Sequence, residues 1–383
     1  MRRLTVVLGV PVDEVTQAEA LDRIEEFVAR GGRLHQVATV NSDFLARALA
    51  DPELLHILRH VDLATADGMP LVWASRVLGG SIPERVTGAD LVPALAERFA
   101  ASGRSLFLLG ARPEVAQTAA ERLCERFPGL RISGVYSPPM ADLESMDHAT
   151  ILRRVNAARP DALLVAFGNP KQEKWIHRHR HSLEVPVAIG IGASLDFIAG
   201  SARRAPVWIQ QAGAEWLWRL GNEPGRLWRR YAGDFRHLAP GLIRYWRLTR
   251  QTRSPRPPEE GSDGIRAIGP HSIGVAGRFG ADQRGAFETL ALRSLVGGLA
   301  ERMREEPEAT SPPGSSGHVY VDLRACTYID SAGLGCLASL AHEARARGYD
   351  IRVYPGSPAI RRLLGLGGLD QHLGAADDVE GVG

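Results

Sequence analysis

Residues 14 to about 220 alternate between segments of helical periodicity and short apolar runs, and this alternation restricts the possible folds most. A helix is predicted over 16–32, where the apolar pattern ends at Gly31, and another over 112–127. Strands are predicted for the apolar runs 34–40, 105–110, 130–136, 162–168 and 185–192. Strands that alternate with helices predict an α/β fold in which helices cover both faces of a largely parallel sheet.

A change of composition separates this region from a second one. Residues 251–263 are rich in proline, glycine, serine and charge, which predicts a linker between domains at 1–250 and 264–383. In the second domain, strands are expected over 271–279, 318–325 and 350–356, helices over 282–304, 331–348 and 357–368, and a loop over 304–317. The sequence therefore predicts a smaller α/β domain after the linker.

Composition excludes several classes of protein. The 383 residues exceed one ordinary domain, and a net charge of +2 excludes a uniformly basic nucleic-acid binder. The three cysteines have neither metal-type spacing nor a disulfide pattern, which favours a reducing, cytosolic setting. No stretch of the sequence reaches 18 consecutive apolar residues, so no transmembrane helix is expected. The first apolar run is followed at once by Asp13 and Glu14, so we interpret it as a strand rather than a signal peptide.

One segment combines arginine with tryptophan. Residues 201–256 hold 12 arginines, three acidic residues and five of the seven tryptophans. This combination suits a phosphate-rich ligand or the headgroup layer of a membrane. It equally suits a pair of amphipathic helices with tryptophan in the core and arginine in solvent.

Four polar clusters fall where strands should end, at the edge where parallel sheets bind ligands. They contribute Thr39 and Asn41, Asp67, Arg85, and Gln172. Gly168 and Pro170 begin a helix whose free N–H groups suit a polar or anionic ligand. Each cluster also has a simpler explanation, since Asp67-Gly68 is common turn chemistry, Thr39 and Asn41 suit a helix cap, and Arg85 could pair with Asp90. Together they predict a binding site.

The order of short motifs resembles that of a known family. The motifs are T-x-N (39–41), A-D-G (66–68), E-R-x-x-G-x-D-L (84–91), F-L-L-G (107–110), G-N-P-K-Q-E (168–173), R-A-P (204–206), E-W-L-W-R-L (215–220) and E-P-x-R-x-x-R-R-Y (223–231). Over residues 4–250 the chain thereby resembles the WecG/TagA/CpsF glycosyltransferases. This implies an inverting enzyme that moves a sugar, often N-acetylmannosamine, from a UDP donor to an undecaprenyl-diphosphate-linked sugar.

The resemblance also implies roles for single residues. Asp67 matches the general base that deprotonates the acceptor hydroxyl, and Thr39 and Asn41 match residues that hold the acceptor sugar or nearby polar groups. Arg85 and Gln172 match groups that contact the donor's sugar or diphosphate. Further arginines lie in the appendage 201–250, which is expected to close over the site and touch the membrane: Arg219, Arg226 and Arg229, the last beside the alternative Arg230.

Chemical requirements agree with these roles. An inverting transfer needs one carboxylate near the attacking hydroxyl and positive charge on the departing diphosphate. No Asp-x-Asp triplet occurs in the chain, so we predict that arginines supply this charge and that neither metal nor cofactor is needed. A nucleotide-binding oxidoreductase is the competing interpretation, but the run 190–197 lacks the third glycine of the required motif.

The run I-D-S-A-G-L-G (329–335) follows a predicted strand and opens a helix. Asp330 and Ser331 could act only as helix caps. The run nevertheless resembles the STAS domain of anti-sigma-factor antagonists, over about residues 264–375. This resemblance implies that Ser331 matches the serine phosphorylated by a partner kinase, so an anti-sigma-factor kinase or another STAS partner is expected.

The sequence as a whole predicts a Rossmann-like α/β glycosyltransferase with a helical Arg/Trp appendage and a regulatory STAS domain. Expected partners are a UDP-sugar, a polyprenyl-diphosphate-linked acceptor and a membrane surface, and no nucleic acid. We expect a peripheral protein at the cytoplasmic face of the membrane that takes part in cell-envelope polysaccharide synthesis. The alternative is a STAS-based signalling scaffold whose transferase domain has decayed.

Overall fold

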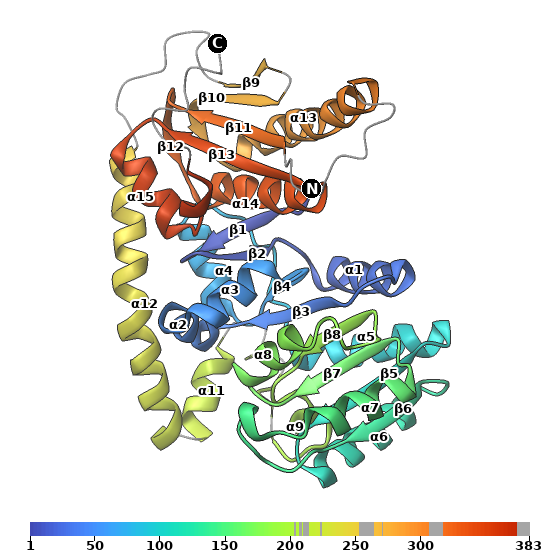
Figure 1. Cartoon of the computed structure of the whole chain (residues 1–383). Coiled ribbons are helices and arrows are strands. Elements are labelled where there is room, and N and C mark those ends of the chain that lie inside the picture. Colours follow the sequence, from blue (N-terminus) through green and yellow to red (C-terminus); the bar gives the residue numbers. More distant parts are fainter. Residues whose placement is uncertain are drawn as a thin grey trace. The chain divides into compact units, whose positions relative to one another are not determined.

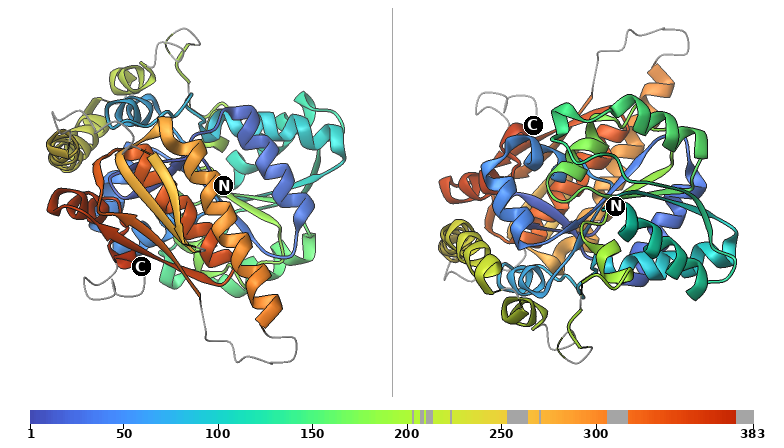
Figure 2. Two further views of the ribbon diagram at one scale, coloured as in Figure 1. Left: turned by 90° about the horizontal axis from the view of Figure 1, so that it is seen from above. Right: turned by 90° about the horizontal axis from the view of Figure 1, so that it is seen from below.

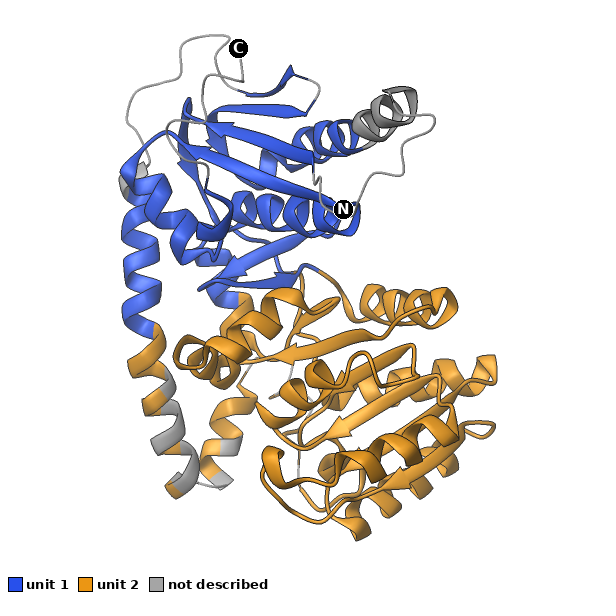
Figure 3. Ribbon diagram, in the orientation of Figure 1, with its two compact units in different colours: residues 1–14, 73–82, 239–383 blue, residues 15–72, 83–238 orange. Residues whose placement is uncertain are grey.

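A computed structural model describes residues 1–373 except 203, 207–208, 210–213, 223, 253–263, 270 and 306–316. Nearly all of the predicted linker (251–263) and of the predicted loop (304–317) therefore lies outside the described residues. The chain forms two compact units (Figure 3). Unit 1 comprises Met1–Glu14, Trp73–Ile82 and Ala239–Gly383, and unit 2 comprises Val15–Val72 and Pro83–Leu238.

Unit 2 contains a six-stranded parallel sheet in the order β4-β3-β8-β7-β5-β6 (Figure 1). Its strands are β3 (His35–Val40), β4 (Leu63–Ala66), β5 (Ser105–Gly110), β6 (Arg131–Tyr136), β7 (Ala162–Ala166) and β8 (Val187–Gly190). The central strands are buried on both faces, which explains their nearly continuous apolar runs. The predicted parallel sheet and its five predicted strands are confirmed.

Helices cover both faces of this sheet, as predicted (Figures 1 and 2). On one face lie α1 (Gln17–Arg30), α5 (Gly88–Ser102) and α6 (Pro113–Arg126), and on the other α7 (His148–Ala158) and α8 (Lys171–Arg178). The unit also contains α2 (Ser42–Ala50), α3 (Pro52–His60), the short η1 (Leu143–Ser145) and α9 (Ser194–Ile198). Sequence explains the start of α1, because Thr16 and Glu19 form a reciprocal capping box.

The carboxyl-terminal part of unit 1 is a second α/β layer. Its sheet has the order β12-β10-β11-β13, with β9 antiparallel to β10 and the other neighbours parallel. The strands are β9 (Gly264–Gly269), β10 (Ser272–Phe279), β11 (Gly317–Leu323), β12 (Cys326–Ile329) and β13 (Tyr349–Pro355). The helices are η2 (Ala281–Gln283), α13 (Arg284–Glu305), α14 (Ser331–Ala346), α15 (Pro358–Leu366) and η3 (Asp370–His372). The smaller α/β domain is thus confirmed.

Unit 1 also includes segments from the first part of the chain. An antiparallel hairpin is formed by β1 (Leu4–Val7) and β2 (Val10–Asp13), where a first strand was expected. The helices α4 (Met69–Val77) and α12 (Pro224–Thr252) each run across a boundary between the units. Helix α14 lies between the β9–β13 sheet and the hairpin (Figure 1).

The predicted Arg/Trp appendage is helical and consists of α11 (Glu215–Asn222) and α12. Large apolar side chains on α12 are exposed, among them Trp228 (65% exposed) and Phe235 (74%). At 100° per residue, these two and the exposed Ile243 and Trp246 fall within an arc of about 80°. Helix α12 therefore presents an apolar stripe, and exposed arginines occur along the same helix: Arg236, Arg244, Arg247 and Arg250. None of the described helices is long and apolar enough to span a membrane.

Candidate active site

The carboxyl ends of β3, β4, β7 and β8 bring four of the predicted site residues to one edge of the sheet: Thr39, Asn41, Asp67 and Gln172. Thr39 is buried, and its hydroxyl donates a hydrogen bond to the Gly190 carbonyl at 3.2 Å, which ties β3 to β8. The Asn41 side-chain oxygen accepts from the Phe44 N–H at 3.1 Å and caps α2. Asn41 thus has the capping role that the simpler interpretation predicts, whereas Thr39 joins two strands instead of capping the helix; both lie at the candidate site.

Asp67 directly follows β4. Its N–H donates to the Val40 carbonyl at 2.7 Å, so the end of β4 is fixed beside the end of β3. The next residue, Gly68, has a φ of +137°, a conformation that disfavours every residue with a side chain. Because α4 begins immediately afterwards, this turn holds the half-buried Asp67 at the edge of the sheet.

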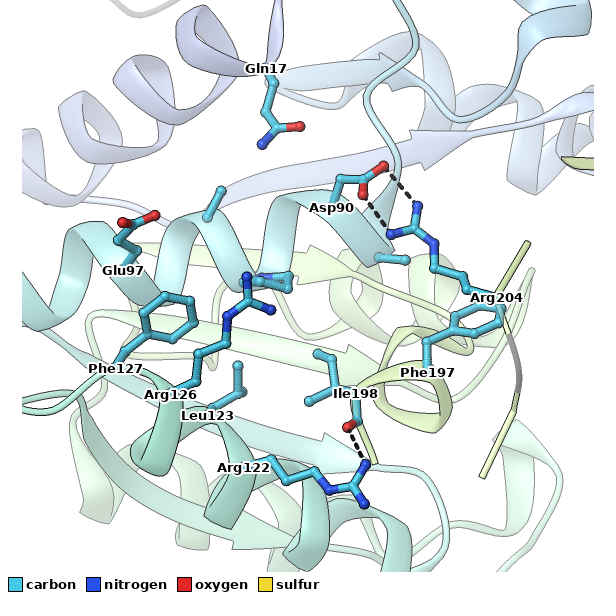
Figure 4. A pocket seen from close by; sticks show the side chains of 13 residues that line it. Gln17, Asp90, Glu97, Arg122, Leu123, Arg126, Phe127, Phe197, Ile198 and Arg204 are labelled. Atoms are coloured by element: carbon cyan, nitrogen blue, oxygen red, sulfur yellow. Dashed lines mark hydrogen bonds and ion pairs between the residues drawn. The ribbon is translucent and has the colours of Figure 1, made fainter. Parts of the chain in front are cut away.

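Arginines and acids form a network next to this edge. The Arg85 Nη1 atom donates to Glu215 Oε2 at 2.9 Å, and its Nη2 atom lies 3.9 Å from Asp90 Oδ2. Arg204 binds the same Asp90 through two hydrogen bonds of 2.6 and 2.8 Å (Figure 4). Since Glu215 is the first residue of α11, the network attaches the appendage to the sheet edge.

The charges in this network influence one another. Burial opposes ionisation of Asp90, but the hydrogen bonds from Arg204 and the positive charge of Arg85 hold the pKa of Asp90 below its ordinary value. The bonds to Asp90 raise the pKa of Arg204 despite burial, and the carboxylates of Glu215 and Asp67 act in the same direction. The candidate base therefore lies within the electrostatic reach of a charged arginine.

Gln172 connects two loops at the same edge. Its Oε1 atom accepts from the N–H groups of Gly168 and Gly192, each at 3.1 Å, and thereby joins the ends of β7 and β8. Its Nε2 atom donates to Glu173 Oε1 at 2.8 Å. Gln172 is only 1% exposed, so in this arrangement its amide shapes the loops around the site.

Glu173 is a buried acid at this edge that sequence reasoning missed. Its side chain is fully buried, and no described group bonds to its Oε2 atom. Burial raises the pKa of Glu173 to about 8, because the hydrogen bond from Gln172 only partly offsets the loss of water. A Cβ atom at Gly190 would lie 2.3 Å from Glu173 Oε1. The sequence G-I-G (190–192) therefore makes room for this acid.

A cavity of about 650 Å³ extends from the Asp90–Arg204 pair along α5 and α6 (Figure 4). Its charged lining includes Arg122 and Arg126, but Arg122 already binds the Ile198 carbonyl at 3.1 Å. The candidate base and the T-x-N motif do not line this cavity. Among the described residues, no cluster of three or more His, Cys, Asp or Glu side chains could hold a metal ion.

The remaining predicted residues lie elsewhere. Arg219 is in α11 and Arg226 and Arg229 are in α12, but their side chains lie outside what the structure describes. Ser331 begins α14 in unit 1. Asp90 and Arg204 were not predicted as a pair, although each lies in a recognised motif, E-R-x-x-G-x-D-L or R-A-P. The same holds for Arg85 and Glu215, because each pair joins residues more than 100 positions apart.

Comparison with known proteins identifies the families to which the two regions of the chain belong. Residues 5–253 match the family described as "Glycosyl transferase WecG/TagA/CpsF family", so the chain is a glycosyltransferase. It belongs to the WecG/TagA/CpsF family, as the motifs predicted. Residues 282–375 match a family described as "Mlab, STAS domain", which confirms the second resemblance.

Two relatives bear the same printed name, N-acetylglucosaminyldiphosphoundecaprenol N-acetyl-beta-D-mannosaminyltransferase. The protein from Bacillus spizizenii is 32% identical over 194 residues, which are 51% of this chain and 73% of the relative. The protein from Staphylococcus aureus strain NCTC 8325 is 30% identical over 214 residues, 56% of this chain and 82% of the relative.

Proposed function

We propose that this chain transfers an N-acetylmannosamine-type sugar from a UDP donor to N-acetylglucosaminyl-diphospho-undecaprenol, with inversion at the sugar's anomeric carbon. The relatives' names support the sugar and the acceptor. The position of Asp67 beside the Arg85–Asp90–Arg204 network is the observation that carries the proposal, because it combines one acid with positive charge at the edge where parallel sheets bind ligands.

In the proposed step, Asp67 takes the proton of the acceptor hydroxyl as its oxygen attacks the anomeric carbon. The bond from that carbon to the diphosphate breaks at the same time, and UDP leaves with the electron pair. One carboxylate suffices for this inverting displacement, and arginines stabilise the charge that develops on the diphosphate. Planar guanidinium groups suit phosphate oxygens, which supports a transfer that needs no metal.

The other predicted residues divide between the two substrates. Thr39 and Asn41 are assigned to the acceptor sugar. Arg85 is assigned to the donor diphosphate, which would compete with Glu215 for its guanidinium group. Gln172 serves the donor side by shaping the Gly168 and Gly192 loops. The appendage completes the site through Arg219, Arg226 and Arg229.

The appendage also supports binding at a membrane surface. Trp228, Phe235, Ile243 and Trp246 form the exposed apolar stripe of α12, and the Arg250 guanidinium lies 3.8 Å from the centre of the Trp246 ring. Aromatic rings with adjacent arginines suit the headgroup layer, where apolar and charged groups are both accommodated. Such binding would bring the site to a polyprenyl-linked acceptor at the cytoplasmic face.

The proposal is tested by mass spectrometry of the lipid product. The full chain is incubated with undecaprenyl-diphosphate-N-acetylglucosamine and, in turn, UDP-N-acetylmannosamine, UDP-N-acetylglucosamine or UDP-glucose, each with EDTA or with Mg²⁺. We expect one added N-acetylhexosamine from the first donor, in EDTA as well as in Mg²⁺, and NMR of the product should show the anomeric configuration opposite to that of the donor. Absence of a lipid-linked product with every donor would contradict the proposal and favour the signalling-scaffold alternative.

A further inference from the structure

The first residue of α14 is bound on both sides by segments from the transferase-family part of the chain. Ser331 is fully buried. Its hydroxyl donates a hydrogen bond to the Val6 carbonyl of β1, and its N–H donates to the Leu78 carbonyl just after α4, at 3.0 Å. The hydroxyl and the backbone N–H of Ser331 thus both have hydrogen-bond acceptors within unit 1.

Two glycines show how closely these segments approach. A Cβ atom at Gly335 of α14 would lie 1.8 Å from the Leu4 carbonyl oxygen, which no structure tolerates without movement. A Cβ atom at Gly79 would lie 2.7 Å from the Asp330 Cβ, and Gly79 has a φ of +88°. The backbone of β1 therefore lies directly on α14, where an added side chain has no space.

A buried ion pair makes the contact specific. Glu14, next to β2, receives hydrogen bonds of 2.5 and 2.8 Å from Arg284 at the start of α13. Its two oxygens also accept from the hydroxyls of Thr5 and Ser81, at 2.5 and 2.8 Å. Glu14 is 4% and Arg284 9% exposed, so both charges are buried. Each compensates the loss of hydration of the other, and removal of one would leave an unpaired buried charge.

We propose that the start of α14 is an intramolecular docking surface whose occupant is the β1–β2 hairpin, together with the turn after α4. A kinase or another protein reaches Ser331 only after the hairpin leaves. A phosphate would add nearly two negative charges where the Ser331 hydroxyl now donates to a carbonyl oxygen, and the preceding residue, Asp330, is itself an acid. Phosphorylation of Ser331 and docking of the hairpin therefore exclude each other.

This docking has a consequence for the transferase region. Helix α4 begins two residues after Asp67 and ends just before Leu78, which binds Ser331. Release of the hairpin and of Leu78 would thus remove the contacts that hold the carboxyl end of α4. The amino end of the same helix directly follows the candidate base, Asp67. This consequence rests on the proposed role of Asp67, whereas the docking itself does not.

Hydrogen exchange of the full chain, followed by mass spectrometry, tests the docking without any substrate. Gly335→Ala adds a methyl group against β1. Gly365→Ala is the matched control, because Gly365 also lies in a helix but no neighbouring atom lies within 4 Å of its added Cβ. We expect at least tenfold faster exchange at 4–13 and 78–82 in Gly335→Ala, with 349–355 unchanged, and wild-type exchange in Gly365→Ala.

A second variant keeps the test decisive if Gly335→Ala disturbs the whole domain. Ser331→Ala removes one hydroxyl without adding atoms, and we expect exchange at 4–13 to rise on the order of fivefold, as for the loss of one hydrogen bond. Wild-type exchange of 4–13 in both Gly335→Ala and Ser331→Ala would overturn the proposal. Because no sugar transfer is measured, failure here leaves the proposed function untouched.

Discussion

The buried Glu173 should make stability depend on pH in a direction opposite to that of ordinary carboxylates. Its pKa rises from an ordinary 4.5 to about 8 in the folded chain, so between these values the folded state keeps a proton that the unfolded state has lost. The contribution of Glu173 to stability is therefore complete below pH 4.5 and is lost as the pH rises towards 8. In Glu173→Gln, which cannot titrate, this loss is absent.

The size of this pH-dependent loss of stability follows from the shift in the pKa of Glu173. One pH unit within this window changes the free energy of unfolding by about 1.4 kcal/mol, so the interval from pH 5.5 to 7.5 amounts to about 2.7 kcal/mol. The neighbouring groups that influence Glu173 are Gln172 and its own backbone, which carry no charge, so other titrations cancel when the two proteins are compared.

Urea unfolding followed by tryptophan fluorescence measures this difference, since Trp175 is fully buried two residues away. The free energy of unfolding of the wild type, minus that of Glu173→Gln, should fall steadily from pH 5.5 to 7.5. Parallel pH profiles for the two proteins would refute the assignment of a neutral, buried acid to this position.

Three further changes test other parts of the structure. Gly190→Ala places a methyl group against Glu173 and should lower the free energy of unfolding by about 1–3 kcal/mol. The control Gly221→Ala, whose added Cβ has no neighbour within 4 Å, should not lower it. Equal urea midpoints for the two variants would contradict the tight packing at Gly190. Arg284→Met leaves Glu14 buried without its ion partner and should cost about 3–5 kcal/mol in urea unfolding. Adding Glu14→Gln should restore part of this loss, and no recovery would count against the pairing. Replacing both Trp228 and Phe235 by serine should weaken sedimentation with anionic vesicles at least tenfold, about 1.4 kcal/mol. Leu292→Ser, at an exposed leucine of α13 (37% exposed), should have no such effect, and equal losses would contradict the role of α12.

Much of the fold was predictable because strands buried on both faces leave an apolar run in the sequence. The runs 105–110 and 162–168 mark β5 and β7 almost to the residue. Strand β4, by contrast, has only the four residues LATA, too few to show a period, although the turn at Asp67-Gly68 after it was visible. Strand β9 was also missed, because its pairing with β10 is what makes it a strand.

The site was predictable where motifs are local and not where contacts join distant segments. Asn41 caps the helix that follows it, as its position suggested. The bond between Arg85 and Glu215 joins residues 130 positions apart, and that between Ser331 and Val6 joins residues 325 positions apart. Such contacts depend on how the whole chain packs, so no sequence window contains a signal for them.

The central claim is that Asp67 is the base of a sugar transfer to a lipid-linked acceptor. The most direct measurement is the rate of UDP release from UDP-N-acetylmannosamine with and without undecaprenyl-diphosphate-N-acetylglucosamine, for wild type, Asp67→Asn and Asp22→Asn. Asp22 is an exposed aspartate of α1 and serves as the matched control. We expect acceptor-dependent release that falls by about 10²–10⁴-fold in Asp67→Asn and stays unchanged in Asp22→Asn. Release by Asp67→Asn at the wild-type rate would contradict the claim.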